Sequence, residues 1–360
     1  MQLGIIGLPN SGKTTVFNAL TGSNYETSGV SGGKLAINTA VVNVPDVRVD
    51  KLSAIFHPKK TTYPTITYVD VGGLEKGVGE EGLPGPLRNA LSPVDGFIHV
   101  IRVFEDDTVP HPQVTIDPQR DLETIDTEFL LTDLITVENR LSRLTEEVMK
   151  KGKKATGRSA EEEIALLARL KNHLEEGSPL RNLNLDEEEK AFLKGFGLLT
   201  LKPQVIVVNT EAPVDNPTQF VNVEHDNTIL LALPAQIEAE IAQLDEEDRE
   251  IFMEEYGITE PGANRVVRAS YDLMSIQTFF TVGEDEVRGW SVNIGATAPE
   301  AAGIIHSDLQ RGFIRAECVA YEDFITYGSL AKAKTEGKVR LEGKQYVVQD
   351  GDIMNIRFSV

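Results

Sequence analysis

GLPNSGKT, residues 7–14, follows the apolar run QLGIIG close to the start of the sequence. Gly7 and Gly12 bracket four residues, and Lys13 and Thr14 follow directly, which is the GxxxxGK[ST] pattern of a phosphate-binding loop. Glycine adopts backbone angles that side chains forbid, so successive N–H groups can form an anion nest at the start of a helix. The stretch therefore predicts a loop that holds nucleotide phosphates, with Lys13 at the β- and γ-phosphates and the Thr14 hydroxyl on Mg²⁺.

The segments around this loop predict an α/β fold with a parallel sheet. LGIIG, DGFIHVIRVF and KPQVIVVNT are nearly continuous apolar runs, as expected for strands that are covered on both faces. KTTVFNAL, directly after the loop, has apolar residues at helical spacing. Strands that alternate with helices indicate crossover connections, so we expect a nucleotide-binding domain over 1–120 and 200–276.

Two further segments have a different character. From Leu130 to Val148 the apolar residues are spaced four, three, four, three and four apart, which is a heptad seam, and a second apolar stripe follows from Ile164 to Leu174. We expect an α-helical coiled-coil hairpin inserted over 121–199. Residues 277–360 contain many short β-like runs and one helix-like segment, which predicts a small α+β domain.

Composition sets limits on the class of protein. The chain has 360 residues and a formal net charge of −21, which argues against a surface coated for nonspecific nucleic-acid binding. Cys318 is the only cysteine, and a single thiol fits a reducing compartment and a packing role. No apolar run approaches the roughly 18–20 residues of a membrane span, and the N-terminus lacks the features of a signal peptide. We expect a cytoplasmic protein that does not associate with membranes.

A second nucleotide-site motif lies in ITYVDVGGL, where Asp70 ends an apolar strand and Gly73 follows three residues later. This DxxG arrangement is typical of GTPase-like proteins, in which the aspartate holds Mg²⁺ through water and the glycine N–H senses the γ-phosphate. Leu74 occupies the position where many GTPases have a glutamine that orients the attacking water. Leucine cannot do this, so we expect slow hydrolysis.

The segment that should recognise the base lacks the guanine-specific pattern. GTP-binding proteins use NKxD, but VIVVNTEAP offers Asn209, Thr210 and Glu211, without the lysine and without an aspartate three residues after the asparagine. The site is therefore poorly suited to guanine. Asn209 is either the base contact or an asparagine that caps a loop.

These residues resemble the Obg-like ATPases, called YchF in bacteria, which are TRAFAC-class P-loop NTPases. The resemblance spans nearly the whole chain and is carried by GLPNSGKTTVFNAL, DVGGLEKG, HVIRVFEDD, KPQVIVVNTE and the tail phrases FFTVGEDEVRGW and APEAAGIIHSDLQRGFIRAE. It implies a GTPase-like domain, an inserted coiled coil and a C-terminal TGS domain of β-grasp type. It also implies slow hydrolysis of ATP in preference to GTP, association with ribosomes and a role in translation.

The resemblance carries over residue by residue to the site. It implies Lys13, Asp70 and Gly73 as catalytic residues, Thr14 and Asp70 as ligands of the Mg²⁺ cofactor, and Phe104 in the adenine pocket. The nucleotide-binding set is Asn10, Ser11, Gly12, Lys13, Thr14, Thr15, Phe104, Asn209, Thr210 and Glu211.

Three stretches depart from the family pattern and are consistent with a divergent member. NYETSGVSGGKLAINTA replaces the usual segment after the first helix, so the threonine ligand of Mg²⁺ is not where the family has it; EGLPGPLRNAL and NTE also differ. Two alternatives therefore stay open: a GTPase of the same architecture, or a nucleotide-sensing module with negligible turnover.

A basic cluster, Lys150–Arg158, links the two predicted hairpin helices. It is either a solvated loop tip or, together with the TGS domain, a contact to ribosomal RNA or the large subunit. The six histidines show no metal-ligand spacing, and we expect them to be structural. We expect a monomer whose partners are ATP and the ribosome.

Overall fold

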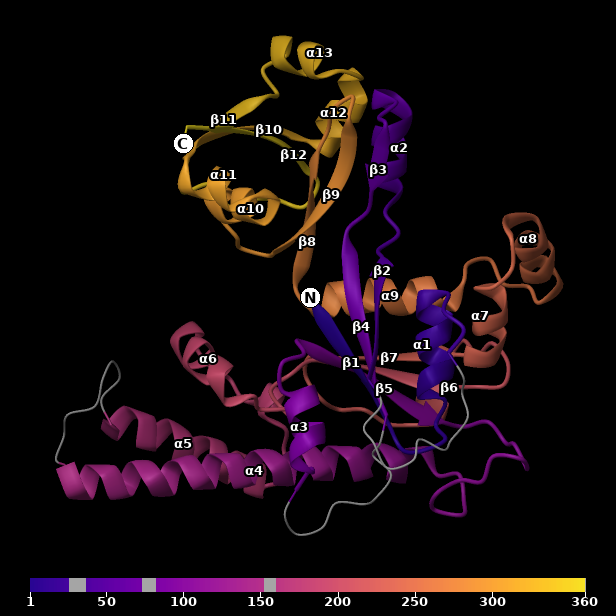
Figure 1. Cartoon of the computed structure of the whole chain (residues 1–360), viewed down its shortest axis with the longest axis vertical. Helices are drawn as coiled ribbons and strands as arrows, with labels where there is room; N and C mark the ends of the chain where they lie inside the picture. Colours follow the sequence, from indigo (N-terminus) through magenta and orange to yellow (C-terminus); the bar gives the residue numbers. More distant parts are fainter. Residues whose placement is uncertain (26–36, 73–81, 152–159, 360) are drawn as a thin grey trace. The chain divides into compact units, whose positions relative to one another are not determined.

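The computed structural model describes residues 1–25, 37–72, 82–151 and 160–359 (Figure 1). The chain divides into two compact units, one of residues 1–40 and 67–266 and the other of residues 41–66 and 267–360. No helix in the described part of the chain is both long and apolar enough to cross a bilayer.

The first unit contains a six-stranded sheet in the order β2-β4-β1-β5-β6-β7. The pairs β1/β4, β1/β5, β5/β6 and β6/β7 are parallel, as the alternation of strands and helices predicts. Every residue of β5 and β6 is buried, because both strands are covered on both faces. The strands are β1 (Gln2–Ile6), β2 (Ile37–Asn43), β4 (Thr65–Val71), β5 (Gly96–Arg102), β6 (Gln204–Asn209) and β7 (Thr228–Leu233).

Helices cover this sheet and place the loops at its edge. Val16, Phe17 and Leu20 form the buried side of α1, which packs against α7. Leu87 of α3 and Phe129 near the start of α4 belong to one apolar cluster with strand residues of β1, β4 and β5. The helices of this unit outside the insertion are α1 (Lys13–Thr21), α3 (Gly85–Leu91), α7 (Ala235–Ile241) and α8 (Glu246–Glu255), and α9 (Gly262–Leu273) begins in this unit and ends in the second.

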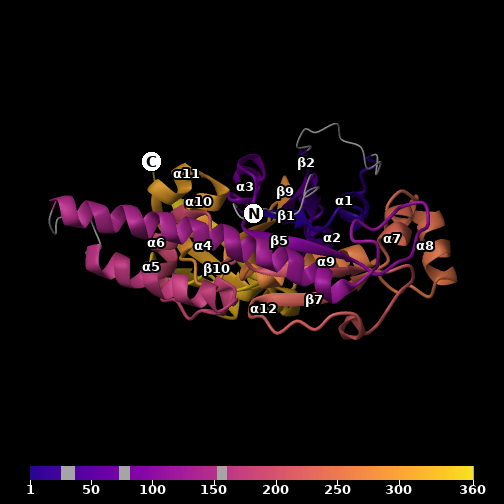
Figure 2. The same cartoon turned by 90° about the horizontal axis from the view of Figure 1, so that it is seen from below.

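The predicted helical hairpin is present. α4 (Pro118–Lys151) and α5 (Ala160–Glu175) lie side by side (Figure 2), and their heptad residues form a single leucine-rich core. A capping box of Asp186 and Glu189 begins α6 (Glu187–Leu193), and 3₁₀ turns occupy Leu180–Asn182 and Lys194–Phe196. Most of the basic cluster Lys150–Arg158 lies outside the described residues.

A buried carboxylate connects the hairpin to the chain that leads into β6. Asp133 of α4 accepts hydrogen bonds from the backbone N–H groups of Leu199 and Thr200 and from the Thr200 hydroxyl, at 2.9, 2.7 and 2.6 Å. Lys202 donates to the carbonyls of Leu91 and Ser92 at the end of α3. The Asp133 hydrogen bonds hold α4, and the Lys202 hydrogen bonds hold the end of α3, to the segment that leads into β6.

The second unit is the α+β domain expected from the tail, with a sheet in the order β11-β10-β12-β8-β9-β3. Its strands are β3 (Lys60–Thr62), β8 (Ile276–Thr281), β9 (Glu286–Asn293), β10 (Phe313–Ala320), β11 (Arg340–Glu342) and β12 (Asp352–Phe358). Its helices are α2 (Val47–Phe56), α10 (Ala298–Ile305), α11 (Ser307–Arg311), α12 (Tyr321–Tyr327) and α13 (Leu330–Thr335).

The division differs from the expected domain boundaries in residues 41–66, which group with the second unit. β3 extends the second sheet by pairing in parallel with β9, and Val49 and Leu52 of α2 are buried with Phe280 of β8 and Val287 of β9. The reason is a long-range pairing that leaves no local signal, since a three-residue edge strand has no periodicity of its own.

Candidate functional site

The loop between β1 and α1 has the backbone of an anion nest. Gly7 and Gly12 have φ angles of 149° and 92°, and Asn10 also has a positive φ of 62°. A Cβ on Gly7 would lie 2.4 Å from the Val100 carbonyl oxygen, so only glycine fits there. The sequence pattern thus corresponds to a geometric requirement at each glycine.

Lys13 lies across this loop. Its Nζ donates to the carbonyl oxygens of Leu8 at 2.8 Å and Gly7 at 3.1 Å. The ammonium is therefore held above the loop backbone, where a β- or γ-phosphate of a nucleotide would also contact it.

Thr14 and Asp70 meet at the predicted metal position, although they are 56 residues apart in the sequence. The Thr14 hydroxyl donates to Asp70 Oδ2 at 3.0 Å, and Asp70 Oδ1 is buried without a hydrogen-bond partner among the described residues. Burial raises the pKa of the Asp70 carboxyl, and the Thr14 hydrogen bond and the Lys13 charge offset part of that shift. A hydroxyl beside a carboxylate with an unpartnered oxygen fits Mg²⁺, which prefers oxygen ligands.

Asn209, at the end of β6, is buried against the loop. Its Nδ2 donates to the Ser11 carbonyl at 3.0 Å, and its Oδ1 accepts from the Ala235 N–H at 3.2 Å. Both ends of the amide are therefore engaged in holding the loop to β6 and α7. Its role in reading the base stays a prediction.

The other predicted residues that the structure describes lie on the loop or at the start of α1, in the segment after β5, or in the segment after β6. Phe104 lies beside the loop, since a Cβ on Gly12 would be 3.9 Å from its ring. Thr210 donates through its hydroxyl to the Ala212 carbonyl at 2.8 Å, and Glu211 is exposed. Ser11 is buried and Thr15 half-buried at the start of α1. Gly73 and Leu74 lie outside the described residues.

Arg102, at the end of β5, is a site residue that motif reasoning missed. Its buried guanidinium donates to the carbonyls of Phe104 at 3.1 Å, Val109 at 2.9 Å and Asn10 at 3.3 Å. It also lies over the Phe104 ring, 4.4 Å from the centroid. Arg102 thus ties the phosphate loop to the segment after β5. An arginine within the buried run HVIRVF was the available signal, since a buried charge needs partners.

Comparison with known proteins agrees with this geometry. Residues 2–140 match a family model described as "50S ribosome-binding GTPase", and residues 276–359 match the model YchF-GTPase_C, described as "Protein of unknown function (DUF933)". The curated protein "Ribosome-binding ATPase YchF" of Bacillus subtilis (strain 168) is 42% identical over 369 residues, covering 100% of both chains. Its namesake from Escherichia coli O157:H7 is 42% identical over 367 residues, covering 100% of this chain and 99% of that protein.

A solved structure gives the same result for the fold. The YchF GTPase of Schizosaccharomyces pombe superposes with a TM-score of 0.82 at 29% sequence identity, covering 99% of this chain and 97% of that one. The expected fold, a P-loop domain followed by a C-terminal domain of the YchF type, is confirmed.

Proposed function

Because the chain belongs to the YchF family of P-loop NTPases, we propose that it is a ribosome-associated ATPase that acts as a slow nucleotide-dependent switch. The observation that carries this proposal is the cluster of Lys13, Thr14 and Asp70 on a loop whose backbone suits an anion. The curated relatives carry the name ribosome-binding ATPase.

Each loop residue has a defined task in the proposed reaction. Water adds to the γ-phosphorus, the bond to the β,γ-bridging oxygen breaks, and ADP and phosphate leave. The loop N–H groups and the Lys13 ammonium hold the phosphates and stabilise the charge that develops on them. Mg²⁺, held by Thr14 and Asp70, would supply further positive charge at the β- and γ-phosphate oxygens. We assign Gly73 the γ-phosphate contact through its N–H.

The proposed turnover is slow because Leu74 has no polar group to orient the attacking water. Catalysis then depends on positioning and charge alone. Phosphate release by the full-length protein with Mg²⁺ and ATP tests this, with Lys13→Ala as the control. Release no faster than in the Lys13→Ala control would mean a nucleotide-sensing module instead of an enzyme.

For the base, we propose adenine, contacted in the region of Phe104, Asn209, Thr210 and Glu211. The chain lacks the NKxD aspartate that pairs with guanine. Calorimetric titration with ATP and GTP in the presence of Mg²⁺ measures the preference directly. Tighter binding of GTP would replace the assignment with a GTPase of the same architecture.

For the partner, we propose that a cytoplasmic monomer binds the large ribosomal subunit or its RNA. Co-sedimentation of the protein with ribosomes across a range of salt concentrations tests the association, and light scattering tests the monomer. Neutralising the basic residues of Lys150–Arg158 tests whether that cluster contributes. Unchanged sedimentation after neutralisation would remove the cluster from the interface.

A further inference from the structure

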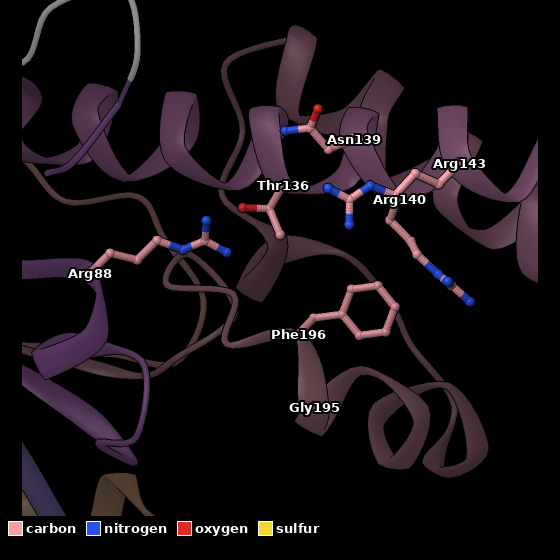
Figure 3. Close-up of a pocket in the computed structure, with 7 residues that line it drawn as sticks. All are labelled: Arg88, Thr136, Asn139, Arg140, Arg143, Gly195 and Phe196. Atoms are coloured by element: carbon pink, nitrogen blue, oxygen red, sulfur yellow. The ribbon is translucent and has the colours of Figure 1, made fainter. Parts of the chain in front are cut away.

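A pocket of about 390 Å³ lies apart from the phosphate loop, between α3, α4 and the turn Lys194–Phe196. Its size is in the range of pockets that hold small ligands. Seven residues line it (Figure 3): Arg88, Thr136, Asn139, Arg140, Arg143, Gly195 and Phe196. Three are arginines, which is unusual on a chain with a net charge of −21.

The four α4 residues share one face of that helix. Thr136, Asn139, Arg140 and Arg143 are three or four positions apart, which brings them to neighbouring turns on the same side. In Figure 3 the Arg88 side chain extends from α3 toward Thr136, so cations from two helices face one space. The sequence separation between Arg88 and Arg143 hides this cluster from any motif search.

The three arginines are not equivalent. Arg140 is bound to Glu163 of α5, with Nε 2.7 Å and Nη2 2.5 Å from the carboxylate. Arg88 is half-buried and Arg143 exposed, and neither has a salt bridge to any residue that the structure describes. Arg140 therefore shapes the pocket wall, while Arg88 and Arg143 can receive an anion from solution.

The remaining lining indicates which anion fits. Phe196 is half-buried, and its ring packs against that of Phe192 with centroids 5.2 Å apart, so it presents a supported aromatic surface. Arginines beside an aromatic ring are the combination that binds single-stranded nucleic acid, with cations on phosphates and the ring against a base. The Asn139 amide and Thr136 hydroxyl add neutral hydrogen-bonding groups.

We propose that this arginine pocket binds the backbone of single-stranded ribosomal RNA, with Arg88 and Arg143 on phosphate oxygens and Phe196 against a base. The inference rests on the proposed association with ribosomes and names a surface for it. On a protein with a net charge of −21, a local cationic site favours approach to RNA phosphates in an orientation that presents this site.

The test uses the full-length protein and a labelled single-stranded RNA of about ten nucleotides. The variant Arg88→Gln/Arg143→Gln removes two pocket charges. Its control, Arg169→Gln/Lys190→Gln, removes two charges from exposed ion pairs of α5 and α6. We expect about tenfold weaker binding in the pocket variant and a salt slope smaller by about 1.4, which is two phosphate contacts. The control should stay within about twofold of the wild type.

The variant Phe196→Leu keeps an apolar side chain and removes the stacking surface. We expect about tenfold weaker RNA binding with an unchanged salt slope, because stacking does not depend on counterion release. Unchanged affinity in both pocket variants would overturn the proposal. So would displacement of the RNA by poly-glutamate at equal or lower concentration, which would indicate an acidic protein partner. Displacement by inorganic phosphate, beyond a chloride control of equal ionic strength, would indicate a site for small anions.

Co-sedimentation separates this inference from the proposed function. If the wild type and the pocket variant sediment equally with ribosomes, the pocket is not the contact and the function stands. If the wild type does not sediment with ribosomes, the proposed ribosome association is wrong. The RNA titration then tests by itself whether the pocket binds single-stranded RNA.

Discussion

The phosphate loop and the arginine pocket both suit anions but are built differently. In the loop, backbone groups and buried side chains are fixed to one another: Lys13, Asn209 and Arg102 all donate to loop carbonyls. In the pocket, Arg88 and Arg143 extend from two helices, and neither forms a salt bridge within the described chain. The phosphate loop is therefore part of the folded core, whereas the arginine pocket is formed by side chains at the surface.

The largest effect should come from Gly12→Ala. The new Cβ would lie 2.2 Å from Asn209 Nδ2 at a φ of 92°, so the substitution strains the backbone and displaces the Asn209 amide that holds the loop. Together these cost about 4 kcal/mol, or roughly a thousandfold in ATP affinity by calorimetry. Gly177→Ala is the control, because Gly177 also has a positive φ of 76° but has open space around its Cβ position. ATP binding by Gly12→Ala within tenfold of the wild type would contradict the rigid-loop account.

Next in size is a pH effect at His99, which lies in β5 and is buried without a hydrogen-bond partner among the described residues. Burial lowers its pKa from 6.5 to about 4. The His99 ring therefore stays neutral in the folded state down to about pH 4, whereas in the unfolded chain it becomes protonated below pH 6.5. The stability that depends on the neutral ring is present above pH 6.5 and is lost as the pH falls toward 4. The loss is about 3 kcal/mol in the free energy of unfolding.

Urea unfolding at several pH values measures this contribution. His99→Leu should lack that part of the pH dependence, whereas His57→Asn, at an exposed histidine with a positive φ, should keep it. Parallel pH profiles for His99→Leu and the wild type would show that His99 is not the source.

A smaller effect is expected from Arg102→Met. This variant keeps a long side chain but leaves the Asn10, Phe104 and Val109 carbonyls without their donor, which loosens the loop. We expect about tenfold weaker ATP binding, roughly 1.4 kcal/mol. Arg249→Met, which removes a single bond to the Leu244 carbonyl, should bind ATP as the wild type does. Equal affinity in both variants would remove Arg102 from the site.

The smallest effect should be on the stability of Arg88→Gln/Arg143→Gln. Substitutions of surface side chains that form no salt bridge within the described residues change stability within about 0.5 kcal/mol, so the melting temperature should be nearly unchanged while RNA binding falls. A loss of more than about 2 kcal/mol would instead mean that these arginines hold α3 and α4 together, and the contrast between the two sites would disappear.

A structural feature could be predicted from the sequence when the residues that define it lie close together in the chain. The Gly7–Thr14 loop could be predicted because its four defining residues, Gly7, Gly12, Lys13 and Thr14, fall within eight consecutive positions. The heptad from Leu130 to Val148 was readable because helical packing repeats locally. Arg102 was missed because its role depends on the Asn10 carbonyl, 92 residues away, as well as on the Phe104 and Val109 carbonyls in the segment after β5.

The amino-acid sequence was enough to predict the P-loop architecture, the helical hairpin, the α+β tail and the family, since each depends on local spacing or on long stretches of similarity. Three features came to light only in the folded structure: β3 pairs with β9 in the second sheet, Asn209 supports the loop, and Arg88 and Arg143 line one pocket. These depend on contacts between residues far apart in the chain. Such contacts form only when buried apolar surfaces fix the elements against one another, and no local pattern encodes them.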